Sequence, residues 1–140
     1  MLALDIGEKR IGVALSDAEG ILASPLIILE VDSESEAVKD IAALIEEYGV
    51  QRIIAGLPRS MDGSLGPQSE IIVAFIARLA PLIKVPLEFR DERLTTFTAR
   101  QMMSDKKRGK KGVKPRYDAA AAAVLLQNYL DESRIFNDND

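Results

Sequence analysis

Residues 2–17 read LALDIGEKRIGVALSD, and this stretch decides the fold class. Two short strands are predicted, over residues 1–6 and 10–16, with the tetrad GEKR between the two apolar runs. In the second run, Ile11, Val13 and Leu15 alternate with small residues, which is typical of a strand with one buried face. Asp5 lies inside the first run, where a carboxylate is unfavourable unless a hydrogen-bond donor, a basic side chain or a metal ion compensates it.

The rest of the chain alternates helices with further strands. Strands are also predicted within 21–31, 51–58 and 85–92, and helices between Ser33 and Gly49, over 68–82, about 96–104, and 117–133. Short loops between the first three strands favour antiparallel pairing, and the helical crossovers before the last two favour parallel pairing. We therefore expect an α/β protein with a five-stranded mixed sheet flanked by helices.

Individual residues mark the ends of these elements. Pro25 indicates that the third strand is at an edge of the sheet or carries a bulge. Ser33 and Glu36 fit a capping box at the start of the first helix, and Gly49 ends that helix. Pro67 is suited to open the second helix.

Composition limits the class of protein. The chain has 140 residues and 47% hydrophobic residues, which fits one domain, expected over residues 1–136 with a frayed acidic tail at 137–140. No apolar run approaches the roughly 20 residues that span a bilayer, and no signal peptide is apparent. The absence of cysteine is compatible with the cytoplasm. The absence of histidine excludes Ser-His and Cys-His nucleophile pairs.

Three acidic features fall where chemistry is expected. Asp5 and the pair Asp91-Glu92 lie at or near the carboxyl ends of parallel strands, and Asp118 lies at the start of the last helix, before five alanines. Each has a simpler reading: a buried paired carboxylate, a solvated surface cluster, and a residue that favours a helix N-terminus. Brought together, however, they would repel one another without a cation, and a set of oxygen ligands without His or Cys selects Mg²⁺ or Mn²⁺.

Basic residues gather in one segment. Residues 105–116 hold seven of the 18 lysines and arginines, although the net charge of the chain is −4. This segment suits a polyanionic substrate, and its alternative is a solvated loop. The basic side chains predicted to contact nucleic acid are Lys9, Arg10, Arg59, Arg93, Lys107, Arg108, Lys110, Lys111, Lys114 and Arg116.

Four segments together resemble the YqgF-type family of Holliday-junction resolvases, also described as pre-16S rRNA nucleases. They are LALDIGEKRIGVALSD, IIAGLPRSMDGSLGPQS, FRDERLTT and YDAAAAAVLLQNYL, which follow the family's order and are spread over nearly the whole length of the chain. The resemblance implies a ribonuclease H-like fold, in which Asp5, Glu92 and Asp118 are catalytic and bind the metal. Asp91 is the alternative to Glu92, since adjacent strand residues point to opposite faces.

The function implied is a Mg²⁺- or Mn²⁺-dependent endonuclease that hydrolyses phosphodiester bonds in the cytoplasm, in 5′-end processing of precursor 16S rRNA. Its partners would be nucleic acid and a ribosomal particle, with no membrane, and the chain would be a monomer or a weak homodimer. One alternative is a Holliday-junction resolvase acting on branched DNA, which would require two active sites and hence a dimer. Another is a non-catalytic ribosome assembly factor, which needs the basic segment but not the carboxylates. A phosphotransferase is disfavoured, because 140 residues are too few for two lobes around ATP.

Overall fold

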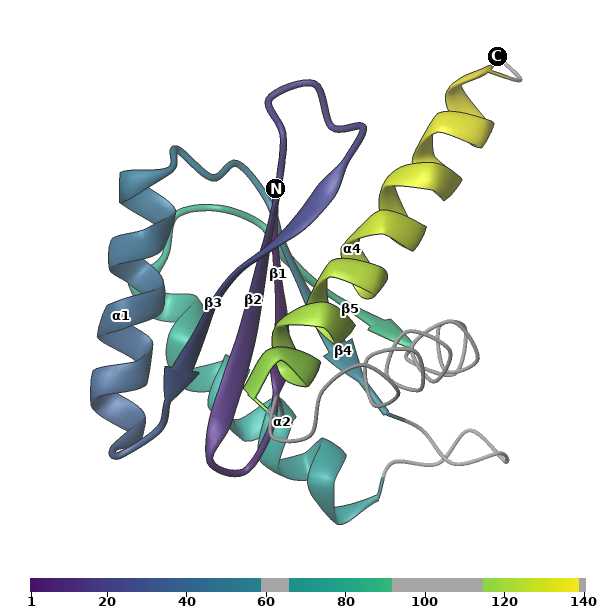
Figure 1. Cartoon of the computed structure of the whole chain (residues 1–140). Coiled ribbons are helices and arrows are strands. Elements are labelled where there is room, and N and C mark those ends of the chain that lie inside the picture. The colour runs from purple at the N-terminus through teal and green to yellow at the C-terminus, as the bar shows by residue number, and fades with distance from the viewer. Residues whose placement is uncertain (59–65, 92–114, 139–140) are drawn as a thin grey trace.

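The computed structural model describes residues 1–58, 66–91 and 115–138, which form a sheet with helices on both faces (Figure 1). The strands are β1 (Leu2–Ile6), β2 (Arg10–Ser16), β3 (Ala23–Glu30), β4 (Ile53–Leu57) and β5 (Leu87–Asp91). The helices are α1 (Glu34–Glu47), α2 (Pro67–Leu79) and α4 (Pro115–Asp138), and a 3₁₀ turn, η1 (Ala80–Leu82), follows α2. The helix predicted at 96–104 lies outside the described residues.

The sheet has the predicted topology. Its order is β3-β2-β1-β4-β5, with antiparallel pairing among β1, β2 and β3 and parallel pairing of β4 with β1 and β5. Both predictions from Pro25 are confirmed, because β3 is an edge strand and its register with β2 shifts between Val13 and Ala14, where Ala14 pairs with Pro25. The carboxyl ends of β1, β4 and β5 therefore point toward one end of the sheet.

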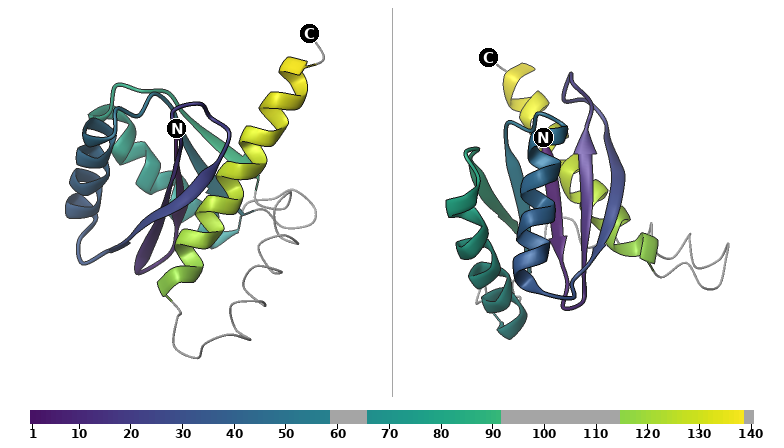
Figure 2. Two further views of the ribbon diagram at one scale, coloured as in Figure 1. Left: turned by 45° about the horizontal axis from the view of Figure 1, so that its top comes forward. Right: turned by 90° about the vertical axis from the view of Figure 1, so that its left-hand side faces the viewer.

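α1 and α2 cover one face of the sheet and α4 covers the other (Figure 2). An apolar layer lies on each of these two faces. Strand alternation sends Leu2, Leu4 and Ile6 into the layer under α1 and α2. Ala3 points the other way, into a smaller layer under α4. Because β1 is buried on both faces, its sequence is a continuous apolar run that only Asp5 interrupts.

The helix ends follow the predicted signals. The Ser33 side chain accepts a hydrogen bond from the Glu36 backbone N–H at 3.2 Å, so the Ser33 half of the capping box is confirmed. Gly49 follows α1 with a φ of 60°, in the left-handed region that glycine adopts without strain. α2 begins at Pro67, as expected for a proline at the first helical position.

The bounds of α4 differ from the prediction. The helix begins at Pro115, not at residue 117, because a proline is well tolerated in the first turn. It continues to Asp138, beyond the predicted end at residue 133, since each residue added to a long helix gains a further hydrogen bond. None of the described helices is long and apolar enough to cross a membrane.

Candidate functional site

Asp5 is the only residue of β1 that is partly exposed. Its neighbours Leu4 and Ile6 pack in the layer under α1 and α2. Alternation along the strand therefore places Asp5 on the opposite face, together with Ala3 and toward α4. The carboxylate that interrupts the first apolar run lies at the carboxyl end of a central strand, where sites of such sheets are found.

Glycines flank Asp5 on the neighbouring strands. Asp5 pairs with Gly12 of β2. The parallel register that joins Leu4 to Ala55, continued by one residue, brings Gly56 of β4 level with Asp5 on the other side. Gly12, Asp5 and Gly56 thus lie side by side on β2, β1 and β4, and only Asp5 has a side chain. Neither neighbouring strand places a side chain directly beside the Asp5 carboxylate.

α4 brings position 118 toward the same end of the sheet. The helix begins at the end where β1 finishes and runs diagonally back over the sheet (Figure 1). Ala122 packs in the layer that contains Ala3 and Ala14. Asp118 lies one turn before Ala122 on the same helix face, and Asp5 lies two residues beyond Ala3 on the same strand face. Positions 5 and 118 therefore lie next to the contact between Ala3 and Ala122, on the side toward the carboxyl end of β1. The Asp118 side chain itself is outside the described residues.

The strand alternation of β5 separates Asp91 from Asp5. Leu87 packs with the layer under α1 and α2, whereas the Glu88 side chain accepts a hydrogen bond from Tyr129 of α4. Residues 87, 89 and 91 therefore belong to the face of α1 and α2. Asp91 lies on the face opposite Asp5, and Glu92 falls outside the described residues.

The described side chains alone do not make up a metal site. Among them, no group of three or more His, Cys, Asp or Glu is arranged to hold a metal ion. Of the three predicted ligands, only Asp5 has a described side chain. It is an oxygen donor in a chain without histidine or cysteine, which fits Mg²⁺ or Mn²⁺ better than zinc.

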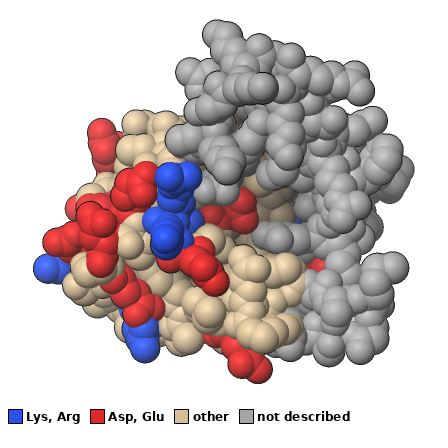
Figure 3. All heavy atoms as spheres, turned by 60° about the horizontal axis from the view of Figure 1, so that its bottom comes forward, with Lys and Arg blue, Asp and Glu red and all other residues tan. Residues whose placement is uncertain are grey.

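Of the basic residues predicted to contact nucleic acid, Lys9 and Arg10 have described side chains. Lys9 is exposed in the turn after β1, at the same end of the sheet as Asp5. Arg10 starts β2 and forms a 3.3 Å ion pair with Glu30. In Figure 3, which views the molecule with the bottom of Figure 1 turned forward, acidic side chains are more widespread than basic ones on the described surface. Arg116 lies in the first turn of α4 without a described side chain, and the remaining predicted contacts lie outside the described residues: Arg59, Arg93, Lys107, Arg108, Lys110, Lys111 and Lys114.

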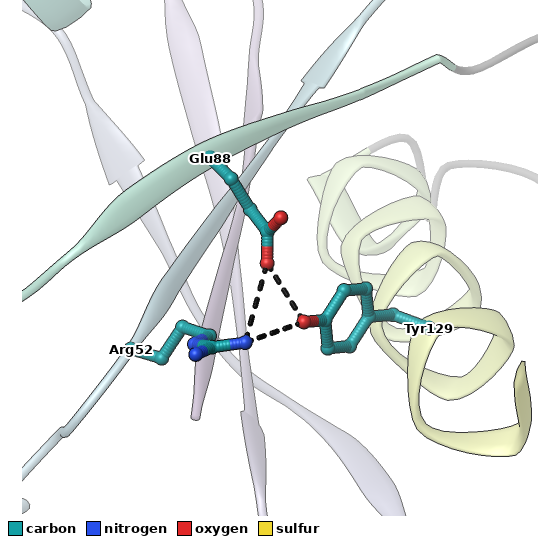
Figure 4. A network of polar contacts seen from close by, with 3 residues as sticks. All are labelled: Arg52, Glu88 and Tyr129. Carbon is teal, nitrogen blue, oxygen red and sulfur yellow. Dashed lines mark hydrogen bonds and ion pairs between the residues drawn. The ribbon is translucent and has the colours of Figure 1, made fainter. Parts of the chain in front are cut away.

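A polar cluster between β5 and α4 was not predicted from the sequence. Tyr129 donates a hydrogen bond to Glu88 at 2.7 Å and accepts one from Arg52 at 2.8 Å (Figure 4). Burial is the main reason that the pKa of Tyr129 is raised, and the hydrogen bond to Glu88 adds to it. Arg90 lies beside this network, with its Cζ 5.9 Å from the centre of the Tyr129 ring. The residues come from three distant segments, and no local pattern links them.

Comparison with known proteins identifies the family. Residues 1–132 match the RuvX family, which is described as Holliday junction resolvase. The chain belongs to the RuvX family. This confirms the YqgF-type resemblance and the assignment to a nuclease family.

Curated relatives of this RuvX-family chain carry the name "Putative pre-16S rRNA nuclease". The protein from Roseiflexus sp. (strain RS-1) is 46% identical over 134 residues, covering 96% of this chain and 95% of that protein. The protein from Dehalococcoides mccartyi is 47% identical over 128 residues, covering 91% and 95%.

Solved structures similar to the RuvX-family chain confirm the ribonuclease H-like fold. RuvC of T. thermophilus in complex with a Holliday junction substrate has a TM-score of 0.60 at 13% identity, covering 96% of each chain. The fowlpox virus Holliday junction resolvase has a TM-score of 0.51 at 14% identity, covering 94% of this chain and 99% of that one. At these identities the likeness establishes the fold alone.

Proposed function

We propose that this RuvX-family chain is a Mg²⁺- or Mn²⁺-dependent endonuclease that acts on precursor 16S rRNA. The observation that carries the proposal is the position of Asp5, a carboxylate between two glycine positions at the carboxyl end of β1 and on the face toward α4. The relatives named as pre-16S rRNA nucleases support the choice of substrate.

Three carboxylates are proposed to hold the metal: Asp5, Glu92 and Asp118. Asp5 is on the α4 face of β1, and Asp118 is in the first turn of α4. Glu92 is preferred to Asp91, because the residue after Asp91 would return to the face of Asp5 if the strand alternation continued. The chemistry supplied by a bound ion is activation of a water molecule and stabilisation of the leaving oxygen of a phosphodiester.

The basic side chains are proposed to hold the phosphates of the substrate. Lys9 is exposed at the Asp5 end of the sheet, and seven basic residues lie within 105–116, directly before Asp118 in the sequence. Because the carboxylates repel a polyanion, neighbouring cations are needed to bring a phosphate close to them. This arrangement needs no histidine, and it fits a protein that acts in the cytoplasm on a ribosomal particle.

The test is cleavage of two end-labelled substrates, an RNA that spans the precursor 5′ region and a four-way DNA junction. Each is incubated with Mg²⁺ or Mn²⁺, or with a chelator. Asp5→Asn keeps the size of the side chain and removes its charge, and Asp40→Asn on the exposed surface of α1 is the matched control. We expect metal-dependent cutting of the RNA by the wild type and by Asp40→Asn, with a loss of more than about a hundredfold in Asp5→Asn.

Other results would select the alternatives. Cutting of the junction in place of the RNA would make the chain a resolvase, as the description of the family favours. Sedimentation would then be expected to show a dimer, because symmetric cutting of two strands uses two sites. Equal cutting by Asp5→Asn and the wild type would contradict the proposed site. RNA binding without any cutting would favour an assembly factor.

A further inference from the structure

Arg90 lies at the centre of the contact between β5 and α4. Its Nη2 donates a hydrogen bond to Glu132, and its guanidinium lies against the ring of Tyr129. The side chain is only 11% exposed, although β5 is an edge strand. Glu88, two residues earlier on the same face, also contacts Tyr129. Glu88 and Arg90, the two residues of β5 that contact α4 on this face, therefore both do so through polar groups.

The apolar layer under α4 does not provide this contact. Among the described residues, the buried members of the layer come from β1, β2, β4 and α4 and none from β5: Ala3, Ala14, Ile54, Ala122, Ala123, Leu125, Leu126 and Leu130. α4 is thus packed on the centre of the sheet by alanine, leucine and isoleucine side chains. The described polar contacts between α4 and the edge strand β5 are made by Glu88 and Arg90.

A buried arginine is a costly way to join two elements. The Nε of Arg90 is buried and has no hydrogen-bond partner in the described part of the chain. An unsatisfied buried donor costs about 1–3 kcal/mol, and well-packed apolar residues often stabilise a fold as much as a buried ion pair does. Stability alone therefore does not account for an arginine here. A directional contact does, because it holds the two elements in one relative position.

Arg90 is also level with the proposed site. It pairs with Gly56 of β4, the residue that the register of β1 and β4 brings level with Asp5. The chain leaves β5 toward Glu92 directly after Arg90 and Asp91. The helix that Arg90 contacts carries Asp118 in its first turn. Arg90 thus joins α4, which carries Asp118, to the strand that ends at the residue before Glu92 in the sequence.

We propose that Arg90 is a positioning residue, which fixes the end of β5 against α4 and so sets the separation of the metal-binding carboxylates. This inference rests on the proposed function. Arg90 contacts neither metal nor substrate in this role and acts through Glu132 and Tyr129. It should consequently affect metal affinity and the chemical step more than the binding of nucleic acid.

The test is a titration of the folded protein with Mn²⁺ alone, followed calorimetrically, together with kcat and KM for cleavage of the RNA. Arg90→Gln removes the charge and the guanidinium, and Glu132→Gln weakens the same contact from the helix side. We expect each variant to bind Mn²⁺ about tenfold more weakly, a change typical of residues that orient metal ligands. kcat should fall with KM nearly unchanged, and Arg90→Lys should recover only part of the affinity.

The matched control is Arg78→Gln, which removes the ion pair between Arg78 of α2 and Glu34 of α1 on the other face of the sheet. It should leave Mn²⁺ affinity unchanged. Wild-type affinity in both Arg90→Gln and Glu132→Gln would overturn the positioning role, and so would a raised KM with unchanged kcat, which would place Arg90 on the nucleic acid. Should Arg90→Gln fail to fold, Glu132→Gln decides. Asp5→Asn is titrated in parallel: unchanged Mn²⁺ affinity there would overturn the proposed function itself.

Discussion

At the scale of single residues, hydrogen bonds from backbone amides to polar side chains determine where helices begin and where the chain turns between strands. Asp17 accepts hydrogen bonds from the backbone N–H groups of Ile21 and Leu22, at 2.7 and 3.2 Å, and so closes the turn between β2 and β3. Ser33 does the same for the first turn of α1. Both are short polar side chains that reach neighbouring amides, which is why the sequence alone can locate such positions.

Ser33→Ala should reduce the free energy of unfolding by about 1 kcal/mol, because one amide at the start of α1 loses its acceptor. Urea denaturation followed by circular dichroism measures the change. The matched control is Ser35→Ala, two residues into the same helix and exposed, which should change stability by less than about 0.5 kcal/mol. Equal losses in the two variants would contradict the capping role.

The turn at Asp17 should respond to acid. The hydrogen bond from Ile21 is the main reason that the pKa of Asp17 is lowered from 3.8. A lowered pKa in the folded state means that the charged form stabilises the fold above pH 3.8 and that this contribution is lost as the pH falls through the folded pKa. Asp17→Asn should therefore show a smaller loss of stability below pH 3.8 than the wild type.

The measurement is thermal unfolding at a series of acidic pH values, together with the NMR titration of the Ile21 amide. Asp40→Asn serves as the control and should follow the wild type, since Asp40 is exposed on α1. A wild-type pH profile in Asp17→Asn, or an Ile21 amide shift that does not change with pH, would show that the turn does not depend on this carboxylate.

At the scale of elements, the alanines of α4 let the helix lie close to the sheet. Ala122 is fully buried and packs with Ala3 and Ala14, so three small side chains meet where helix and strands cross. Close packing of this kind leaves little room for a larger group. It also shortens the distance between the proposed ligand positions on β1 and α4.

Ala122→Leu should destabilise the protein by about 1–3 kcal/mol, since the added atoms must push α4 away from β1 and β2. Ala121→Leu is the matched control, because Ala121 is partly exposed on the same helix turn and has space for the side chain. Chemical denaturation measures both changes. A smaller effect at Ala122 than at Ala121 would mean that α4 does not lie against the sheet as described.

At the scale of the molecule, charge is unevenly distributed. The chain has a net charge of −4, yet seven of its 18 basic residues lie within 105–116. Among the charged side chains on the described surface in Figure 3, acidic ones are more widespread than basic ones. These acidic side chains would repel a polyanion, so binding should depend on the basic segment and should weaken with salt.

Replacing Lys106, Lys107, Lys110 and Lys111 together by glutamine should weaken binding of the precursor RNA. The slope of log affinity against log salt should also become shallower, by about 0.7 for each phosphate of a single strand that the variant no longer neutralises. Fluorescence anisotropy between about 50 and 200 mM salt measures both. The double variant Lys39→Gln and Lys84→Gln, at exposed positions on α1 and before β5, should bind like the wild type. The same slope in both variants would exclude the segment from the interface.

The sequence predicted the fold well because its signals are local. Alternation in β1 and β2, the proline of β3 and the cap of α1 each act within a few residues, and the loop lengths between strands determine parallel or antiparallel pairing. The bounds of α4 were less accurate, because propagation of a long helix extended it at both ends. The motifs that resemble the YqgF-type family likewise located Asp5, Glu92 and Asp118 as expected ligands.

By itself, the sequence determined the order of the elements, the mixed sheet, the family and the oxygen-only donor set, since each depends on residue types and their spacing along the chain. Tertiary structure alone decided which face each residue occupies. It placed Asp5 toward α4 and Asp91 on the opposite face, and it brought Arg90 to Tyr129 and Glu132 of α4. The physical reason is that the face of a residue depends on register and on helix crossing, which are set by packing between segments far apart in the chain.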